Sequence, residues 1–170
     1  VKELYEKAAS NIFISPLHGD VISKVVSLEN QERYILKPYI DTDKFYDMGI
    51  ERDIDYLYVG VICEAKGIDA IRERFRDKDI HLIGSVLKGV DLDFGTYVGR
   101  VPNDELPLYY NRAKNFVVLP RWPEPKGRVV IEAALCGCNI ISNDMVGVLS
   151  FDYDIGDPAN IVNASDDYWE

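Results

Sequence analysis

Short runs of apolar residues alternate along the chain with segments whose apolar positions recur every three or four residues. From residue 55 onward this alternation is regular. It predicts strands at 56–59, 80–83, 96–98, 116–119, 139–142 and 161–162, and helices at 66–76, 103–113 and 127–136. Strands that are apolar at every position are typically buried on both faces. Alternated with helices, they indicate an α/β fold, a Rossmann-like parallel sheet with helices on both faces.

The first 45 residues lie outside this regular pattern. Their pattern predicts two short strands, at 12–14 and 33–36, and one helix between them, at 18–28. A linker that contains proline and aspartate follows at 37–45. We therefore divide the chain into residues 1–45, a remnant of a neighbouring domain with its connector, and residues 46–170, the main domain. Because the first residue is Val1 rather than Met, we expect the chain to be a piece of a longer protein.

Composition narrows the possible partners. The chain has 170 residues, of which 47% are hydrophobic and 28% charged, as in an ordinary soluble globular protein. No apolar run approaches the ~20 residues of a transmembrane segment, and the start has no signal-peptide pattern. The net charge of −10 argues against nucleic acid as a partner, because phosphate backbones are bound by dense basic surfaces.

The sequence predicts neither a metal site nor a cofactor. Its three cysteines form no disulfide framework, which favours a reducing compartment. Cys136 and Cys138 are separated by one glycine, but no second pair or nearby histidine completes a zinc site, so buried thiols are the simpler interpretation. Asp91 and Asp93 have the spacing of a metal-binding pair, but a solvated loop explains them better.

Basic residues gather where strands of the predicted sheet lead into helices. Ligands of open parallel sheets bind beyond the carboxyl ends of the strands. The loop before the helix at 127–136 carries Arg121, Lys126 and Arg128, and Gly127 lets the backbone come close to a ligand. The helix that follows presents free N–H groups and a positive dipole end, which suits a phosphate. Lys66 and Arg100 follow other strands at the same predicted edge.

Glu132 is the most unusual residue of the predicted helices. It lies in a helix that is otherwise apolar on every side. Such a helix is buried, and a buried carboxylate is unfavourable unless it is paired or hydrogen-bonded. Two interpretations stay open: Glu132 points into a polar cleft and accepts hydrogen bonds from ligand hydroxyls, or it meets a structural arginine or a solvent gap.

The segment from Glu124 to Glu132 resembles the E-x7-E motif of retaining glycosyltransferases of the GT-B fold, in the group 1 or family 4-like set. In that family a glycine follows the first glutamate by three residues and an alanine follows the second, as Gly127 and Ala133 do here. The resemblance covers about residues 35–165 and identifies the chain with the C-terminal, donor-binding domain of such an enzyme.

Further landmarks occur in the family's order. The family's interdomain element resembles Ile40-Asp41 with Phe45, and its first strand and phosphate-binding lysine resemble Gly60 with Lys66-Gly67. Its second strand with a glycine turn resembles residues 80–85, and its segment beside the nucleotide base resembles residues 97–101. The resemblance implies a nucleotide-diphosphate sugar as donor substrate. It assigns sugar hydroxyls to Glu124, ribose hydroxyls to Glu132, the diphosphate to Lys66 with the backbone of Gly127 and Arg128, and the base to the backbone near Arg100 and Val101.

The chain departs from the family pattern at several positions, and one of them bears on the diphosphate. The family has an arginine directly after the glycine of the first strand, where this chain has Val61. Two alternatives stay open: a nucleotide-sugar epimerase on the same scaffold, and a non-catalytic sugar-nucleotide-binding domain, which Val61 motivates.

The resemblance also implies what the parent protein does. It would transfer a sugar to a glycan, lipid or polysaccharide acceptor that is held by the N-terminal domain. Because most of that domain is absent from this chain, we expect the fragment alone to be inactive. The expected location is the cytoplasm, with peripheral membrane contact through other parts of the full-length protein.

Overall fold

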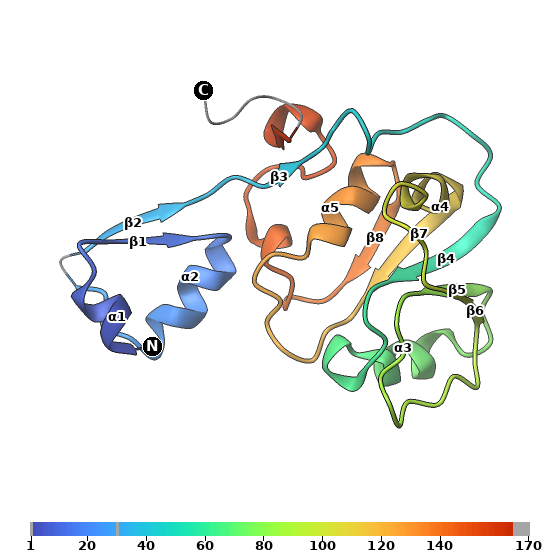
Figure 1. Cartoon of the computed structure of the whole chain (residues 1–170), viewed down its shortest axis with the longest axis horizontal. Coiled ribbons are helices and arrows are strands. Elements are labelled where there is room, and N and C mark those ends of the chain that lie inside the picture. The colour runs from blue at the N-terminus through green and yellow to red at the C-terminus, as the bar shows by residue number, and fades with distance from the viewer. Residues whose placement is uncertain (1, 30, 165–170) are drawn as a thin grey trace.

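The computed structural model describes residues 2–29 and 31–164, and its centre is a five-stranded parallel sheet (Figure 1). The strands lie in the order β6 (Thr96–Gly99), β5 (Ile80–Ile83), β4 (Ile54–Val59), β7 (Ala113–Val118) and β8 (Asn139–Ser142). All four pairings are parallel. The chain starts in the middle at β4, winds to the β6 edge and returns through β7 to the β8 edge. The predicted α/β fold is confirmed.

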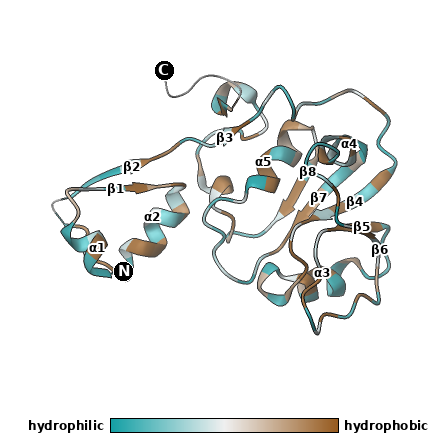
Figure 2. Ribbon diagram, viewed as in Figure 1, coloured by the Kyte–Doolittle hydropathy of each residue, from teal (hydrophilic) through white to brown (hydrophobic). Residues whose placement is uncertain are grey.

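Helices cover both faces of this sheet. Helix α3 (Ile68–Phe75) packs on one face, and α4 (Leu106–Arg112) and α5 (Arg128–Leu135) pack on the other. Side chains of the central strands alternate between the two cores: Leu57 and Val59 face α4 and α5, whereas Tyr58 faces α3. The hydrophobic strands at the centre of the main body are visible in Figure 2.

The three helices of the main domain are shorter than predicted. Helix α3 begins only after the left-handed Gly67, because residues Glu64–Lys66 form a separate 3₁₀ turn. Helix α4 begins at Leu106 with a proline in its first turn, a position that proline favours. It ends at Arg112 because Ala113 is extended and starts β7.

The N-terminal segment forms a small unit with its own core. It contains α1 (Lys2–Lys7), β1 (Ser10–Phe13), α2 (Pro16–Ser23) and β2 (Glu32–Ile35), with β1 and β2 paired in parallel. Its core consists of Phe13, Val26 and Leu28. The helix predicted at 18–28 was wrong at both ends: Ser15 caps α2 and Pro16 starts it, and the helix ends at Ser23. The sequence pattern did not predict α1.

The connector at 37–45 is more structured than a plain linker. Its strand β3 (Tyr39–Ile40) pairs in parallel with β9 (Val162–Asn163). Ile40 and Phe45 are fully buried in the core beside α4 and α5, so the end of the predicted 1–45 segment packs into the main domain. The last residues of that predicted domain, 165–170, lie outside the described part.

Candidate functional site

A cleft of about 270 Å³ opens over the carboxyl ends of β4 and β7. The strand order reverses between these two neighbours, which is where open parallel sheets bind their ligands. The cleft is lined by four of the predicted site residues, Lys66, Glu124, Gly127 and Arg128. The structure therefore brings together Lys66 and Glu124, which lie on two loops and are 58 positions apart in the sequence.

Lys66 and Glu124 form an ion pair across this cleft. The backbone packing beneath them explains why they meet. Gly67 has a φ of 76°, and a β-carbon there would lie 1.7 Å from the carbonyl oxygen of Leu119. Only glycine allows the loop after β4 to lie this close to the end of β7. The side chains of Lys66 and Glu124 are 41% and 26% exposed, so both remain within reach of a ligand.

The loop that carries Glu124 is held by the backbone of residues 145–148. The Glu124 N–H donates to the Met145 carbonyl at 2.7 Å, and the Gly147 N–H donates to the Glu124 carbonyl at 2.8 Å. The Val148 N–H donates to the Lys126 carbonyl at 2.9 Å. These bonds hold the backbone of the loop at Glu124 and at Lys126.

The amino end of α5 forms part of the cleft wall. Gly127 takes a left-handed conformation (φ 80°, ψ 51°) directly before the helix, and no side chain caps the first N–H groups. Uncapped N–H groups at the positive end of a helix dipole bind anions. Arg128 adds a positive charge at the same point. Burial, followed by repulsion from Arg128, lowers the pKa of the nearby Lys126.

A second cleft, of about 230 Å³, continues the first along the sheet edge. Val59, Gly60 and Val61 line both. Arg100 and Val101, which the sequence assigned to the base, line the second cleft. Val61 is 43% exposed at the junction of the two, at the position where the family has an arginine.

Glu132 lies apart from both clefts. It is only 2% exposed, and neither cleft is lined by it. One carboxylate oxygen accepts a hydrogen bond from Nε of Arg128 at 2.8 Å, and the other accepts from the hydroxyl of Tyr110 at 3.1 Å. Burial raises the pKa of Glu132, and the contact with Arg128 partly opposes that shift. The carboxylate is thus paired with an arginine, as one of the two interpretations expected; its contact with ribose stays a prediction.

Two tyrosines of the site were missed by sequence reasoning. Tyr110 is fully buried beneath Glu132, and burial is the main cause that raises its pKa well above the usual value. Tyr58 lines the first cleft and donates to the Val61 carbonyl at 2.8 Å, which fixes the loop after β4. Both lie in apolar segments where a tyrosine is ordinary, so the sequence carried no specific sign of either.

Arg121 does not join the basic residues in the cleft. It forms an ion pair with Asp69 at the start of α3 instead. Within residues 2–29 and 31–164, no group of three or more histidine, cysteine, aspartate or glutamate side chains is placed to hold a metal ion. The helices of these same ranges include none that is both long and apolar enough to cross a membrane.

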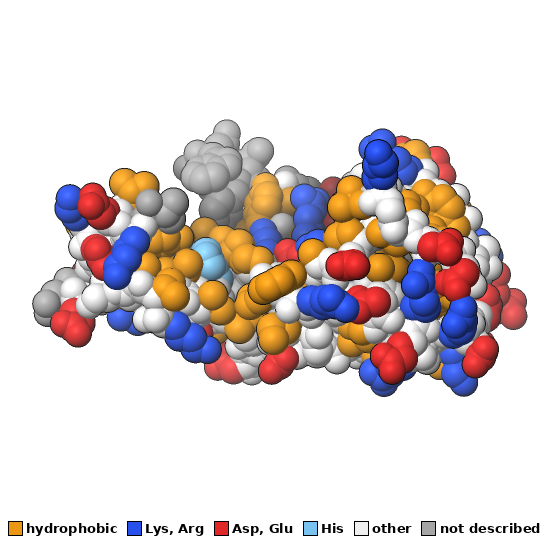
Figure 3. Space-filling model, turned by 90° about the horizontal axis from the view of Figure 1, so that it is seen from below, with side chains coloured by type: hydrophobic (Ala, Val, Ile, Leu, Met, Phe, Trp, Pro, Cys, Tyr) orange, Lys and Arg blue, Asp and Glu red, His pale blue; other side chains and the backbone are white. Residues whose placement is uncertain are grey.

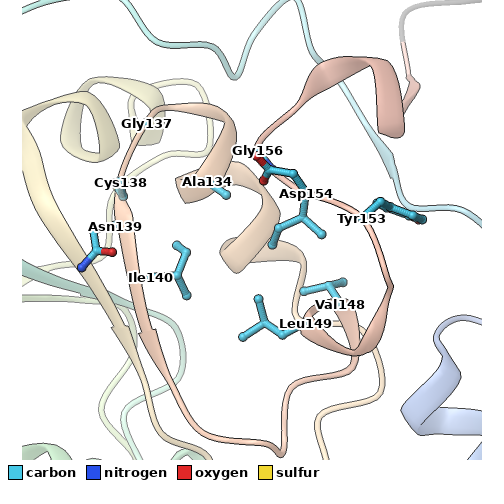
Figure 4. Close-up of a pocket in the computed structure, with 11 residues that line it drawn as sticks. Ala134, Gly137, Cys138, Asn139, Ile140, Val148, Leu149, Tyr153, Asp154 and Gly156 are labelled. Carbon is cyan, nitrogen blue, oxygen red and sulfur yellow. The ribbon is translucent and has the colours of Figure 1, made fainter.

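A wider groove of about 580 Å³ lies elsewhere, beside the edge strand β8 (Figure 4). It is lined by Cys138, Asn139, Ile140, Leu149 and Asp154 among others. None of the predicted site residues lines it. We therefore place the candidate site in the two smaller clefts, because the charged groups lie there, although this groove is larger.

Comparison with known proteins agrees with the fold and with a resemblance to glycosyltransferases. The family model described as "Glycosyl transferases group 1" matches residues 95–151, a range that includes Arg100, Val101 and the whole segment from Glu124 to Glu132. This match confirms the resemblance to group 1 glycosyltransferases, whereas the retaining mechanism and the E-x7-E assignment stay predictions. An uncharacterized 41.2 kDa protein in the cps region of Klebsiella pneumoniae is 27% identical over 152 residues, covering 84% of this chain and 41% of that protein.

Solved structures share the fold at lower identity. Sucrose-phosphate synthase from Thermosynechococcus elongatus is 23% identical with a TM-score of 0.73, over 86% of this chain and 43% of that one. Anabaena Alr3699/HepE in complex with UDP and glucose is 17% identical with a TM-score of 0.65, over 87% and 48%. The chain thus spans less than half the length of these relatives.

Proposed function

We propose that this chain is the donor-binding domain of a glycosyltransferase that uses a nucleotide-diphosphate sugar. The observation that carries the proposal is the cleft in which Lys66, Glu124 and the uncapped amino end of α5 come together. A structure similar in fold was solved with UDP-glucose bound, which supports the same ligand class here.

The chemistry follows from the charges in the cleft. Breaking the bond between sugar and nucleotide leaves negative charge on the diphosphate, and fixed positive groups stabilise that charge. Lys66 and the amino end of α5 are the groups that do so in our proposal, with Arg128 beside them. Glu124 accepts hydrogen bonds from the sugar hydroxyls, Glu132 binds the ribose, and the base lies along Arg100 and Val101. Transfer with retention of configuration is part of the proposal.

The acceptor site lies, in our proposal, in the full-length protein outside this chain. We propose a glycan, lipid or polysaccharide acceptor held by the N-terminal domain, in the cytoplasm or at the membrane periphery. The chain spans 41% of its Klebsiella relative. On this proposal the chain alone binds donor without transferring sugar.

Calorimetric titration with UDP-, GDP- and ADP-sugars tests donor binding. We expect one of them to bind, and we expect Lys66→Ala to weaken that binding by about 1.5–3 kcal/mol, the range for a hydrogen bond to a charged group. Lys78→Ala is the matched control. Lys78 is exposed and lies before the amino end of β5, whereas the clefts lie at the carboxyl ends of the strands. The absence of heat with all three sugar nucleotides at millimolar concentration would contradict the proposal.

Val61 favours the second candidate, a non-catalytic sugar-nucleotide-binding domain. It places an exposed apolar side chain between the two clefts, where the family has a cation. An assay of the full-length protein separates the candidates: a transferase yields a glycosylated acceptor, an epimerase yields a changed sugar without net transfer, and a binding domain yields neither.

A further inference from the structure

The small N-terminal unit meets the Glu124 loop through one buried hydroxyl. Ser15 is fully buried directly before α2. Its Oγ accepts the His18 N–H at 3.1 Å, which caps the helix, and donates to the carbonyl of Pro125 at 2.6 Å. The same hydroxyl therefore serves two elements that are 110 residues apart in the sequence.

Gly147 closes this contact from the other side. A β-carbon there would lie 2.0 Å from the Pro125 carbonyl oxygen and 2.5 Å from Oγ of Ser15. A second link runs parallel: the Leu17 N–H donates to Oγ of Ser150 at 2.9 Å, and that hydroxyl donates to the Gly147 carbonyl at 2.6 Å. Figure 3 shows hydrophobic side chains gathered where the smaller unit meets the main body. The Pro125 carbonyl is thus enclosed by polar contacts and by packing.

The enclosed Pro125 carbonyl lies between Glu124 and the amino end of α5, the two parts of the loop that we assign to the donor. Glu124 immediately precedes Pro125, and Gly127 follows two residues later. A rotation of the Pro125–Lys126 peptide would move the Glu124 side chain relative to Lys66 and would move the amino end of α5. A proline and a glycine flank the turn, so the hydrogen bond from Ser15 selects among orientations that the local sequence does not determine.

We propose that Ser15 is a positioning residue for the donor site. The N-terminal unit lines neither cleft, since every residue of their walls comes from position 58 or later. Through Ser15 it adds an attachment at Pro125, between the backbone bonds of Glu124 and Lys126, and so contributes to the geometry of Glu124. The positioning role rests on the proposed function, because it presupposes that the cleft binds a donor. The contact between Ser15 and Pro125 can be tested without any ligand.

The first test is amide hydrogen exchange on the whole chain. We expect Ser15→Ala to speed exchange about tenfold at the amides of 124, 126, 127, 147 and 148, the effect of losing one buried hydrogen bond. Ser23→Ala is the matched control, because its hydroxyl donates to Gly19 within the same exposed helix. Ser150→Ala removes the parallel link and should loosen the same amides, so the test survives if Ser15→Ala fails to fold. Faster exchange confined to α2 would mean that Ser15 only caps its helix, and would overturn the proposal.

The second test compares UDP-glucose with UDP. UDP-glucose contacts both Glu124 and the amino end of α5 in our proposal, whereas UDP contacts only the latter. Ser15→Ala should therefore raise the Kd for UDP-glucose about tenfold and raise the Kd for UDP by a smaller factor. Loosened amides with both affinities unchanged would refute the positioning role and leave the proposed function standing. If wild type binds no sugar nucleotide, the proposed function fails, and the exchange experiment still decides whether Ser15 holds the loop.

Discussion

Replacing Glu132 with glutamine separates the stability of the domain from its proposed binding of the nucleotide. The substitution keeps the shape of the side chain and removes its charge. Glu132 is 2% exposed, whereas the side chain of its partner Arg128 is 59% exposed. When the carboxylate loses its charge, the guanidinium therefore remains solvated and no unpaired charge is left inside the protein.

The effect on stability follows from this asymmetry. Removing one member of a buried ion pair strongly destabilises a protein, chiefly because the other charge is left buried without a partner. That penalty does not arise here, and an i,i+4 pair with an exposed arginine contributes only about 0.3–0.5 kcal/mol. The raised pKa shows that burial outweighs the pairing. We expect Glu132→Gln to lie within about 1 kcal/mol of wild type at pH 7, on the more stable side.

The effect on binding has the opposite sign. A hydrogen bond to a charged acceptor contributes about 1.5–3 kcal/mol, and one to a neutral acceptor about 0.5–1.5 kcal/mol. If Glu132 accepts ribose hydroxyls, the amide should weaken nucleotide-sugar binding by about 1–2 kcal/mol, or roughly 5- to 30-fold in Kd.

The pH dependence of unfolding offers an independent check. The folded-state pKa of Glu132 is raised, so between the unfolded and folded pKa values the native state binds more protons than the unfolded state. The contribution of this group to stability is therefore present below the unfolded pKa and is lost as pH rises toward the folded one. Glu132→Gln should remove that loss, and its advantage over wild type should grow as pH rises through this window.

Urea unfolding at several pH values and calorimetric titration of the same proteins measure both effects. Glu73→Gln is the control, since Glu73 is an exposed residue in the middle of α3. A large loss of stability with unchanged affinity would show that Glu132 is purely structural and would refute the ribose assignment.

Three further substitutions test other features of the site and of the fold. Val61→Arg restores a cation between the clefts and should tighten sugar-nucleotide binding by about 1 kcal/mol at low salt, measured by calorimetry; unchanged affinity would show that Val61 does not limit binding. Gly84→Ala should destabilise the domain by about 3 kcal/mol in urea unfolding, because its β-carbon would lie 1.8 Å from the Gly60 carbonyl oxygen at a φ of 139°. Arg52→Met should lower the free energy of unfolding by about 2–4 kcal/mol, because Arg52 donates to the carbonyls of Ala113 and Cys136 at 2.7 and 2.8 Å; a loss under 1 kcal/mol would contradict that role.

The sheet was predictable because its strands are short and apolar throughout. Phe116, Val117 and Val118 are all buried, which is what a central parallel strand requires. The pairing of Tyr39–Ile40 with Val162–Asn163 was not predictable, because two-residue strands separated by some 120 positions leave no local pattern. Helix α1 was missed for a related reason: it buries no residue and so has no apolar face.

The site was predictable to a different degree at each residue. Lys66 and Glu124 were assigned by the family motif, and the structure places them in one cleft. The ion pair of Glu132 with Arg128 has the i,i+4 spacing of a helix and could have been anticipated from the sequence. Ser15 could not, because a serine before a proline predicts a helix cap and carries no information about a carbonyl 110 residues away.

The ion pair between Lys66 and Glu124 links two steps of donor recognition in our proposal. Without ligand, the lysine is neutralised by the carboxylate, which is reasonable in a chain of net charge −10. A diphosphate must compete with Glu124 for Lys66, and once it does so Glu124 is free to accept hydrogen bonds from a sugar. A donor that carries both groups gives each residue a partner, whereas a nucleotide diphosphate alone leaves Glu124 without one. The site should therefore favour UDP-glucose over UDP, and Glu124→Gln should abolish that preference because an uncharged side chain no longer competes for the lysine.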